Sequence, residues 1–488
     1  MSVQRKIKTV AEIGALLAKR GSRKVVLCHG EFDLLHFGHT RYFKAAKKFG
    51  DLLVVTLTPD RFIAKGPGRP VFNQDQRAEA IANLEFVDYV AINEWPTALE
   101  TLEQIKPDIY VKGSEYLNKV DVTGRLEAEK KKVESLGGKM EFTHEIIFSS
   151  SKLLNNHFEV FSKEARPFLS KLSESTKAET ILESLQGLEK LKVLVLGEFG
   201  LEQVHLVAPG QPALVEESYP APQGALLGLN VLKAFCDHLD FLSIAGANQA
   251  PVAPWMPPQV FADLIVDDRW VYPSGERFVD KSGFCRFEVN FQKPAPLSAE
   301  EEKKILGRLE KKLAGYDLVL VFDLGLGFVT PKIKEKLARR ANHLSLFLGV
   351  ERPGAVHQAL ADYRKLDLLV SSNRLFADGA AAWALTEPIW RDQPDLLLTT
   401  EGGGLLRQSQ LGQIPLPPLV PSGSSRPGVD WPSAVFSLTA CLDKLGLSED
   451  WVLLLGGATA SLSLNAPAGP WSFEKMLFDK FVIALLNR

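Results

Sequence analysis

The chain has 488 residues, with 57 Lys and Arg against 59 Asp and Glu and a net charge of −2. At about 150 residues per domain, this length predicts two to three domains. The balanced charge gives no reason to expect an extended nucleic-acid-binding or membrane-binding surface. A hydrophobic fraction of 45% with 24% charged residues is typical of soluble globular chains and disfavours disordered and fibrous classes. We therefore expect partners to bind at local sites.

The cysteines and apolar runs favour a cytoplasmic protein. Cys28, Cys236, Cys285 and Cys441 are far apart and form no CxxC pair, which predicts reduced, buried thiols. The first ten residues carry charge where a signal peptide needs an apolar stretch, so we expect no export. The uncharged run 451–471 is interrupted by glycine and proline, so we expect a buried strand and turn there and no membrane span.

The N-terminal third alternates short apolar runs with helical periodicity. From 24 to about 148 the apolar runs are KVVLCHG, DLLVVTLT, DYVAIN and DIYVKG, each followed by an amphipathic stretch. Strands that alternate with helices predict βαβ units and a mostly parallel sheet. We place this first α/β domain at 1–155. The charged helical stretches that follow lack a strand signal and predict a helical connector over 156–190.

A second α/β pattern fills 191–488. It begins with KVLVLGEFG and continues through DLVLVFDLG, LSLFLGV, LDLLVSS and DLLLTT. Between 255 and 291 the texture changes to alternating aromatic and polar residues, which predicts a small antiparallel sheet attached to this domain.

The strongest chemical signal is HGEFDLLHFGHTRYF at 29–43. It follows an apolar strand and continues into an amphipathic helix, which places His36, Gly38 and His39 at the amino end of that helix. Free backbone N–H groups and the helix dipole favour anions there, Gly38 allows close backbone approach, and two imidazoles can donate to phosphate oxygens. The segment predicts a phosphate clamp.

Two other interpretations of the histidine pair stay open. The pair could ligate a metal together with Cys28 or His29, but no second Cys/His cluster completes such a site, so we predict no protein-held metal. Two unrelated surface histidines are the other alternative. The position after a strand and before a helix favours the phosphate clamp over both.

These residues also carry a family resemblance. Gly30, Phe32, Asp33, His36, Gly38 and His39 form the pattern GxFDxxHxGH, which resembles the cytidylyltransferase-like nucleotidyltransferases. The match continues through AKKFGD, KGPGRPVF, QR, VDYV, KPDIYVKGSEY and FSSSKLL. RPVF, VKGSEY and the serine run are most similar to the adenylyltransferase half of bacterial ADP-heptose synthases; glycerol-3-phosphate cytidylyltransferases are a more distant match. Glu31 departs from the small residue or Cys usual in the family, which affects the expected fit of the substrate.

The resemblance implies a reaction. AMP or CMP would pass from a nucleoside triphosphate to a sugar phosphate, with ATP favoured over CTP, Mg²⁺ bridging the triphosphate oxygens, and pyrophosphate leaving. His36, His39 and Lys47 are the implied catalytic residues. Lys65 and Arg77 would hold the pyrophosphate or the acceptor phosphate unless they are solvated surface charges, and the serines would bind phosphate or merely cap a helix. The implied nucleotide- and phosphate-binding residues are Gly30, Phe32, Asp33, Gly38, Lys65, Arg77, Lys112, Gly113, Ser149, Ser150 and Ser151.

The second domain resembles ribokinase-like (PfkB family) sugar kinases with a β-lid, but its chemical positions depart from that pattern. Glu198 and Glu202 stand where the family has aspartates, and RPGVDWPSAVF stands where it has its Gly-Ala-Gly-Asp anion hole and base. Pro432 has no N–H and Trp431 is bulky, so we expect a pseudokinase. A diverged kinase in which Asp430 serves as base, and hence a bifunctional enzyme, is one alternative; a non-catalytic scaffold is another. By the same resemblance we expect a homodimer through a β-lid at 264–291.

Overall fold

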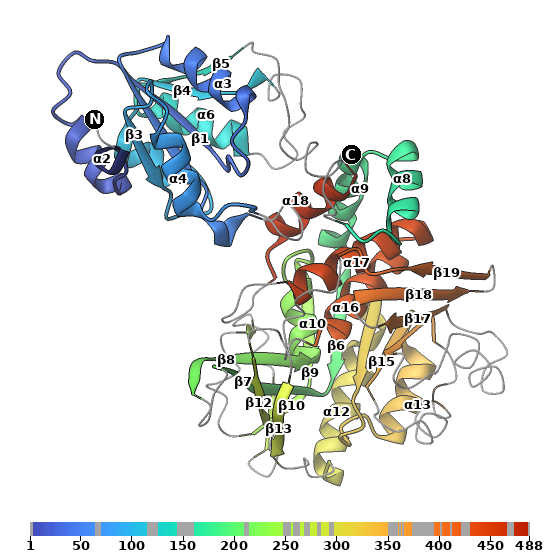
Figure 1. The fold of residues 1–488 in the computed structure, drawn as a ribbon. Coiled ribbons are helices and arrows are strands. Elements are labelled where there is room, and N and C mark those ends of the chain that lie inside the picture. The colour runs from blue at the N-terminus through green and yellow to red at the C-terminus, as the bar shows by residue number, and fades with distance from the viewer. Residues whose placement is uncertain are drawn as a thin grey trace. The chain divides into compact units, whose positions relative to one another are not determined.

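The computed structural model places most of the chain in two compact units. It describes residues 3–63, 70–114, 125–143, 161–208, 214–246, 255–256, 264–267, 274–280, 285–291, 297–349, 360, 363, 366–372, 395–400, 403–409, 412–420, 430–465 and 473–486. The first unit contains Met1–Val160 and Asp479–Arg488, and the second contains Phe161–Phe478. Each is described separately (Figure 1).

The first unit is built around a parallel sheet. Its elements are α1 (Val3–Lys6), α2 (Val10–Leu17), β1 (Val25–Gly30), α3 (Phe37–Lys47), β2 (Leu52–Leu57), η1 (Asp60–Phe62), α4 (Gln74–Ala82), β3 (Tyr89–Ile92), α5 (Leu99–Ile105), β4 (Ile109–Lys112), α6 (Arg125–Ser135) and β5 (Lys139–Phe142). Within the described residues the strand order is β3-β2-β1-β4-β5, and every pair is parallel. The predicted α/β domain with a parallel sheet is confirmed.

Helices cover both faces of this sheet because successive strand residues point to opposite sides. Val26 and Cys28 of β1 pack in one buried cluster with α3 and α4, whereas Val25 and Leu27 pack in another with α2, α5 and α6. Strands buried on both faces explain why the sequence has continuous apolar runs here.

The second unit has a larger mixed sheet and a separate small one. Its elements are α8 (Arg166–Ser175), α9 (Ala178–Ser184), η3 (Leu185–Lys190), β6 (Lys192–Gly197), β7 (Phe199–Val207), β8 (Val215–Gly224), α10 (Ala225–Leu232), β9 (His238–Leu242), β10 (Ile244–Ala245), β11 (Ile265–Val266), β12 (Ser274–Val279), β13 (Cys285–Phe291), α12 (Ala299–Lys312), η5 (Leu313–Gly315), β14 (Leu318–Asp323), α13 (Pro331–Arg340), β15 (Leu344–Leu348), β16 (Leu368–Ser372), β17 (Asp395–Thr400), β18 (Gly404–Ser409), β19 (Gly412–Leu416), α16 (Trp431–Lys444), α17 (Glu449–Leu464) and α18 (Lys475–Leu486), the last of which extends into the first unit.

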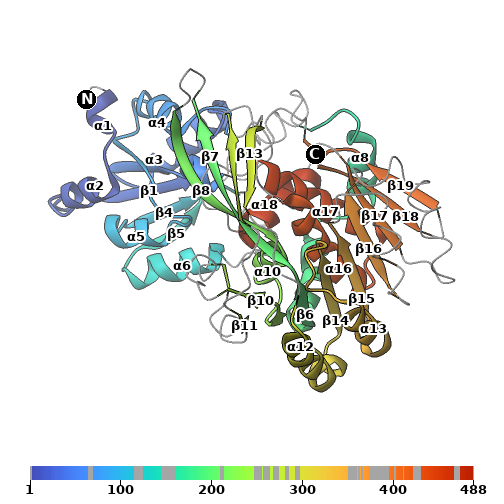
Figure 2. The same ribbon diagram turned by 90° about the horizontal axis from the view of Figure 1, so that it is seen from below.

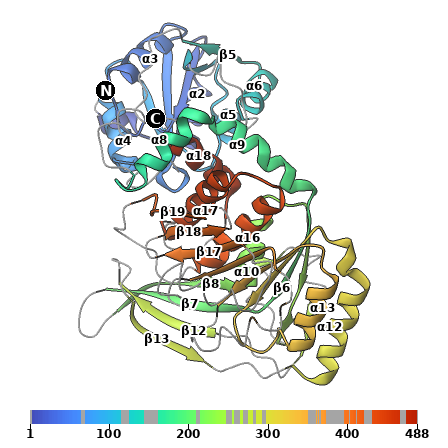
Figure 3. The ribbon, with the colours of Figure 1, turned by 90° about the vertical axis from the view of Figure 1, so that its right-hand side faces the viewer.

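In the described part of this unit the large sheet has the order β19-β18-β17-β16-β15-β14-β6-β9. Its strands pair in parallel from β9 to β17, and β18 and β19 add antiparallel strands. Helices α12 and α13 pack together on one face (Figure 3). On the other face Phe436 of α16 packs against Phe322 and Phe347 of the sheet.

The small sheet only partly matches the sequence prediction. It has the order β13-β12-β7-β8, seen as a separate layer of strands in Figure 2. The expected antiparallel hairpin is β12–β13, but β7 and β8 come from 199–224, and β7 pairs with β12 in parallel. Strand β8 carries Pro220 and Pro222, and an edge strand tolerates proline because one row of its N–H groups needs no partner strand.

The strand and turn predicted within 451–471 is wrong, because helix α17 covers Glu449–Leu464. Gly456 and Gly457, which had suggested a turn, lie inside the helix at a close packing contact. A Cβ on Gly456 would lie 2.8 Å from Thr439 Cγ2, and one on Gly457 would lie 2.7 Å from Leu416 Cδ2. Glycine at these two positions therefore allows close packing against neighbouring side chains and does not form a turn.

Among the described residues, no helix has both the length and the apolarity needed to cross a bilayer.

Candidate active site

The strand order of the first unit reverses direction beside β1, between β1 and β4. The chain moves outward from β1 through β2 to β3, and then returns to β4 on the other side of β1. In open parallel sheets, ligands bind at the carboxyl ends of the strands where the order reverses in this way. The end of β1 leads into His36, and β4 ends at Lys112, so several predicted site residues lie at this switch point.

His36 and His39 stack at the beginning of α3. Their ring centroids are 4.0 Å apart, with an interplanar angle of 22°. His36 is the N-cap, and its Nδ1 accepts a hydrogen bond of 3.0 Å from the N–H of Gly38. Because a neutral imidazole carries only one proton, this bond assigns the proton of neutral His36 to Nε2. The pair therefore combines a side-chain donor with the N–H groups of a helix N-terminus.

Phe32 supports the pair from the preceding loop. Its φ of +45° is unusual for a residue other than glycine. The ring packs edge-on against His39, with 5.4 Å between centroids, and also against Phe43. A Cβ on Gly30 would lie 2.9 Å from Phe32 Cζ, so glycine at position 30 makes room for this ring.

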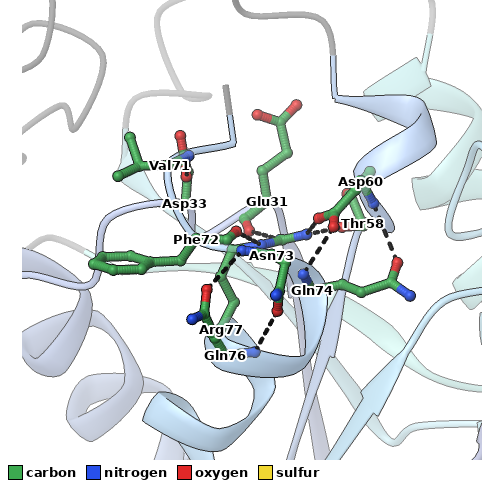
Figure 4. A network of polar contacts seen from close by, with 10 residues as sticks. All are labelled: Glu31, Asp33, Thr58, Asp60, Val71, Phe72, Asn73, Gln74, Gln76 and Arg77. Carbon is green, nitrogen blue, oxygen red and sulfur yellow. Dashed lines mark hydrogen bonds and ion pairs between the residues drawn. The ribbon is translucent and has the colours of Figure 1, made fainter. Parts of the chain in front are cut away.

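Two other residues predicted to contact phosphate hold the surrounding segments. The side chain of Arg77 is 1% exposed, and its guanidinium donates to backbone carbonyls and to Asp60 (Figure 4). Asp33 is 3% exposed, and its Oδ1 accepts a 2.6 Å hydrogen bond from the N–H of Val71. These contacts occupy both side chains, which does not support the phosphate contact predicted for Arg77.

Lys112 is also paired inside the unit. Its Nζ lies 2.7 Å from Oε2 of Glu129 on α6, and both side chains are 9% exposed. The ammonium lies over the ring of Tyr110, whose hydroxyl donates to the same Glu129 oxygen at 3.0 Å. Lys112 and the adjoining Gly113 are thus at the carboxyl edge of the sheet, as predicted, with the lysine held by a buried carboxylate.

The structure does not bring Lys47 together with the histidines. Lys47 is the last residue of α3, whereas His36 caps its first turn. Its ammonium pairs with Asp88 and donates to the carbonyl of Asp51 at 2.7 Å. Asp88 also accepts from the N–H of Leu53, so Lys47 belongs to a structural contact between α3 and the strands. A phosphate contact by Lys47 has no support in this geometry.

Lys65 and Ser149 to Ser151 lie outside the described residues. In the described part of the chain, no group of three or more His, Cys, Asp or Glu side chains is arranged to hold a metal ion.

Sequence reasoning missed Asp60, Thr58 and Glu129. Asp60 and Thr58 follow an apolar strand directly, and that position was a usable signal. Glu129 lies in the run AEKKK, which is typical of a solvated helix face, so no sequence signal separated it from its neighbours.

In the second unit, two candidate carboxylates are bound by backbone N–H groups. Glu198 accepts from the N–H groups of Leu324, Leu326 and Phe328. Burial and the neighbouring Asp323 carboxylate raise the pKa of Glu198 to about 7. Asp430 is the N-cap of α16, where Trp431 and Pro432 begin the helix.

Comparisons with known proteins match the part of the chain that contains the histidine pair. The sequence profile of the Cytidylyltransferase-like family matches residues 27–165. The bifunctional protein HldE of Campylobacter concisus is 40% identical over 138 residues, which is 28% of this chain and 29% of that protein. HldE of Aliarcobacter butzleri is 44% identical over 138 residues, covering 27% of this chain and 29% of that protein. The matches thus span less than a third of the length of these relatives.

The chain is also similar in fold to two solved kinases. Phosphofructokinase-2 from Escherichia coli, in complex with substrates and products, has a TM-score of 0.45 at 13% identity and covers 61% of this chain and 99% of that one. Arabidopsis thaliana ribokinase, complexed with ribose and ATP, has a TM-score of 0.42 at 12% identity, covering 61% and 99%. Residues 27–165 form a cytidylyltransferase-like nucleotidyltransferase domain related to part of HldE.

Proposed function

We propose that the N-terminal unit transfers a nucleotidyl group from a nucleoside triphosphate to a sugar phosphate. The observation that carries this proposal is the stacked pair of His36 and His39 at the first turn of α3, beside the switch point of the sheet. A phosphate oxygen of the acceptor forms a bond to the α-phosphorus, the bond from that phosphorus to the bridging oxygen breaks, and pyrophosphate leaves. The chemistry needs no protein nucleophile.

The chain's own groups would then act by position and charge. The Nε2–H of His36, assigned by the Gly38 bond, and the amides of the helix N-terminus donate to the α-phosphate oxygens, where charge must be stabilised as the leaving bond breaks. His39, fixed against Phe32, completes the clamp. ATP is the favoured donor and an ADP-heptose-like sugar the favoured product, because RPVF, VKGSEY and the serine run resemble the adenylyltransferase half of ADP-heptose synthases. CTP and a glycerol-phosphate-type acceptor are the alternative.

The test is pyrophosphate release from ATP and from CTP across a panel of sugar phosphates, with Mg²⁺ supplied. His36→Ala and His39→Ala should each lower turnover by about 10² to 10⁴, with little change in melting temperature. Wild-type rates in both variants would reject the site. Absence of turnover with every acceptor would favour the non-catalytic scaffold.

We also infer that the C-terminal unit transfers no phosphate. The carboxylate of Asp430 accepts from the N–H of Gly224 at 2.8 Å and from the hydroxyl of Ser433 at 2.6 Å, which supports a structural role. Incubation with labelled ATP and sugars should leave the sugars unlabelled. Robust labelling that Asp430→Asn abolishes would instead support the bifunctional alternative.

We also propose a homodimer through residues 264–291 of the second unit. Two apolar side chains in this range are exposed, Phe287 on β13 (62%) and Val266 on β11 (49%), and a second copy would remove such side chains from water. Sedimentation at micromolar concentration should give a dimer mass, and Phe287→Glu should shift it toward the monomer. A monomeric wild type would contradict this part.

A further inference from the structure

The Arg77 guanidinium ties together three segments around the candidate site. Its Nε donates to the carbonyl of Phe72 at 3.0 Å, Nη1 donates to the carbonyl of Glu31, and Nη2 donates to the carbonyl of Thr58 at 2.9 Å. Nη2 also contacts Asp60 Oδ1 at 2.6 Å. A guanidinium has five N–H donors in a fixed planar fork, so these contacts leave little donor capacity for a ligand.

The partners of Arg77 belong to the segments that leave the sheet at its carboxyl edge. Glu31 follows β1, Thr58 and Asp60 follow β2, and Phe72 precedes α4 (Figure 4). It is the backbone carbonyl of Glu31 that Arg77 holds, while the Glu31 carboxylate points away from the guanidinium in Figure 4. Because the fork is rigid, it sets where the peptide between Glu31 and Phe32 lies relative to the end of β2.

That peptide determines the position of the Phe32 ring. The carbonyl held by Arg77 is joined directly to the nitrogen of Phe32, the residue with φ of +45°. A residue other than glycine adopts this backbone conformation only where its surroundings hold it there. From here the ring lies over Gly30 and packs edge-on against His39. A continuous series of contacts thus leads from Arg77 through the Glu31 carbonyl and Phe32 to His39.

We propose that Arg77 is a positioning residue for the histidine clamp, which it orients through the Glu31 carbonyl and the Phe32 ring without touching the phosphates. The part of this inference that concerns turnover rests on the proposed nucleotidyl transfer. The part that concerns the imidazoles does not, because their orientation can be measured without substrate.

Arg77→Lys is the central variant, since it keeps the charge and removes the planar fork. We expect turnover to fall by about 10-fold to 100-fold at a temperature well below melting, with the KM for the nucleotide changed less than threefold. The imidazole NMR signals of His39, assigned with His39→Ala, should shift in the unliganded protein. Arg20→Met is the matched control, because it breaks another Arg–Asp pair, at 3.2 Å to Asp108, beside the amino end of β4. It should change neither readout.

Phe32→Leu tests the later step and keeps the proposal testable should Arg77→Lys fold poorly. It removes the aromatic contact with His39 without changing any hydrogen-bond partner of Arg77, and should give a comparable loss of turnover. The His39 χ1 angle, measured from three-bond couplings, should also change; couplings are used because loss of the Phe32 ring current by itself moves the imidazole signals. Folded Arg77→Lys protein with wild-type turnover and unshifted His39 signals would overturn the proposal, as would an unchanged His39 χ1 angle in Phe32→Leu. If the wild type releases no pyrophosphate at all, the proposed function fails, while the NMR shifts still decide the positioning role.

Discussion

The buried pair of Lys112 and Glu129 should contribute strongly to the stability of the first unit. Replacing Glu129 with Leu would leave the Lys112 ammonium in a site where its side chain is 9% exposed, without its carboxylate 2.7 Å away. Removing one member of a buried ion pair typically costs about 3–5 kcal/mol. That is a large part of the roughly 5–15 kcal/mol by which a domain is usually stable.

The measurement is urea unfolding of the full chain, with amide exchange in β4 and α6 reporting on this unit. Lys112→Met combined with Glu129→Leu should recover most of the loss, because an apolar replacement of both partners removes the orphaned charge. The control is Glu127→Ala on the same helix, which breaks an exposed pair with Lys131 and should cost at most about 0.5 kcal/mol. A loss below about 1 kcal/mol for Glu129→Leu would refute the reasoning.

The same pair also predicts how the stability of the first unit changes with pH. Burial alone would raise the pKa of Glu129, but the Lys112 ammonium and the hydrogen bonds from Lys112 and Tyr110 hold it below the ordinary value of 4.5. A carboxyl group whose pKa is lowered on folding stabilises the protein above the unfolded pKa. This contribution should be lost as the pH falls through the folded pKa. Glu129→Gln should flatten that acid-side loss, and an unchanged pH profile would contradict the assignment.

Three further predictions concern individual buried groups. Gly457→Ala should destabilise the second unit by about 1–3 kcal/mol, since its Cβ would lie 2.7 Å from Leu416 Cδ2. The control is Gly307→Ala in α12, whose Cβ would meet no atom within 4 Å and which should be neutral or stabilising. Thermal unfolding of the two variants compares these effects. Burial raises the pKa of Cys28 to about 12, so an alkylating reagent at pH 8 should modify this thiol only after unfolding, as peptide mass spectrometry would show. Because the folded pKa of Glu198 is raised to about 7, its contribution to stability should decrease as the pH rises from about 4.5 to 7, and Glu198→Gln should remove this slope in a urea titration.

The sheet of the first unit and the place of its site were predictable because both follow from local patterns. Short apolar runs such as KVVLCHG that alternate with amphipathic stretches predict strands buried on two faces, and the run HFGH, which follows this strand after five residues and begins a helix, is therefore expected at the carboxyl edge of the sheet. Helix α17 was not predictable in this way. Whether Gly456 and Gly457 break a helix depends on how close the facing side chains come, and that distance is set by tertiary packing.

For the site residues, the sequence does not show which cationic side chains already donate to an acidic partner within the fold. Lys47, Arg77 and Lys112 each follow or precede a phosphate-binding motif, so each is a reasonable candidate from its position alone. A cation attracts a phosphate only to the extent that its donors are not already used, and Asp88, Asp60 and Glu129 use them here. The acidic partners lie 17 to 41 residues away in the sequence, and none stands out from the other charged residues. The position of the histidines was easier to predict, because it depends on the helix N-terminus beside them, a feature of the backbone that the sequence pattern does predict.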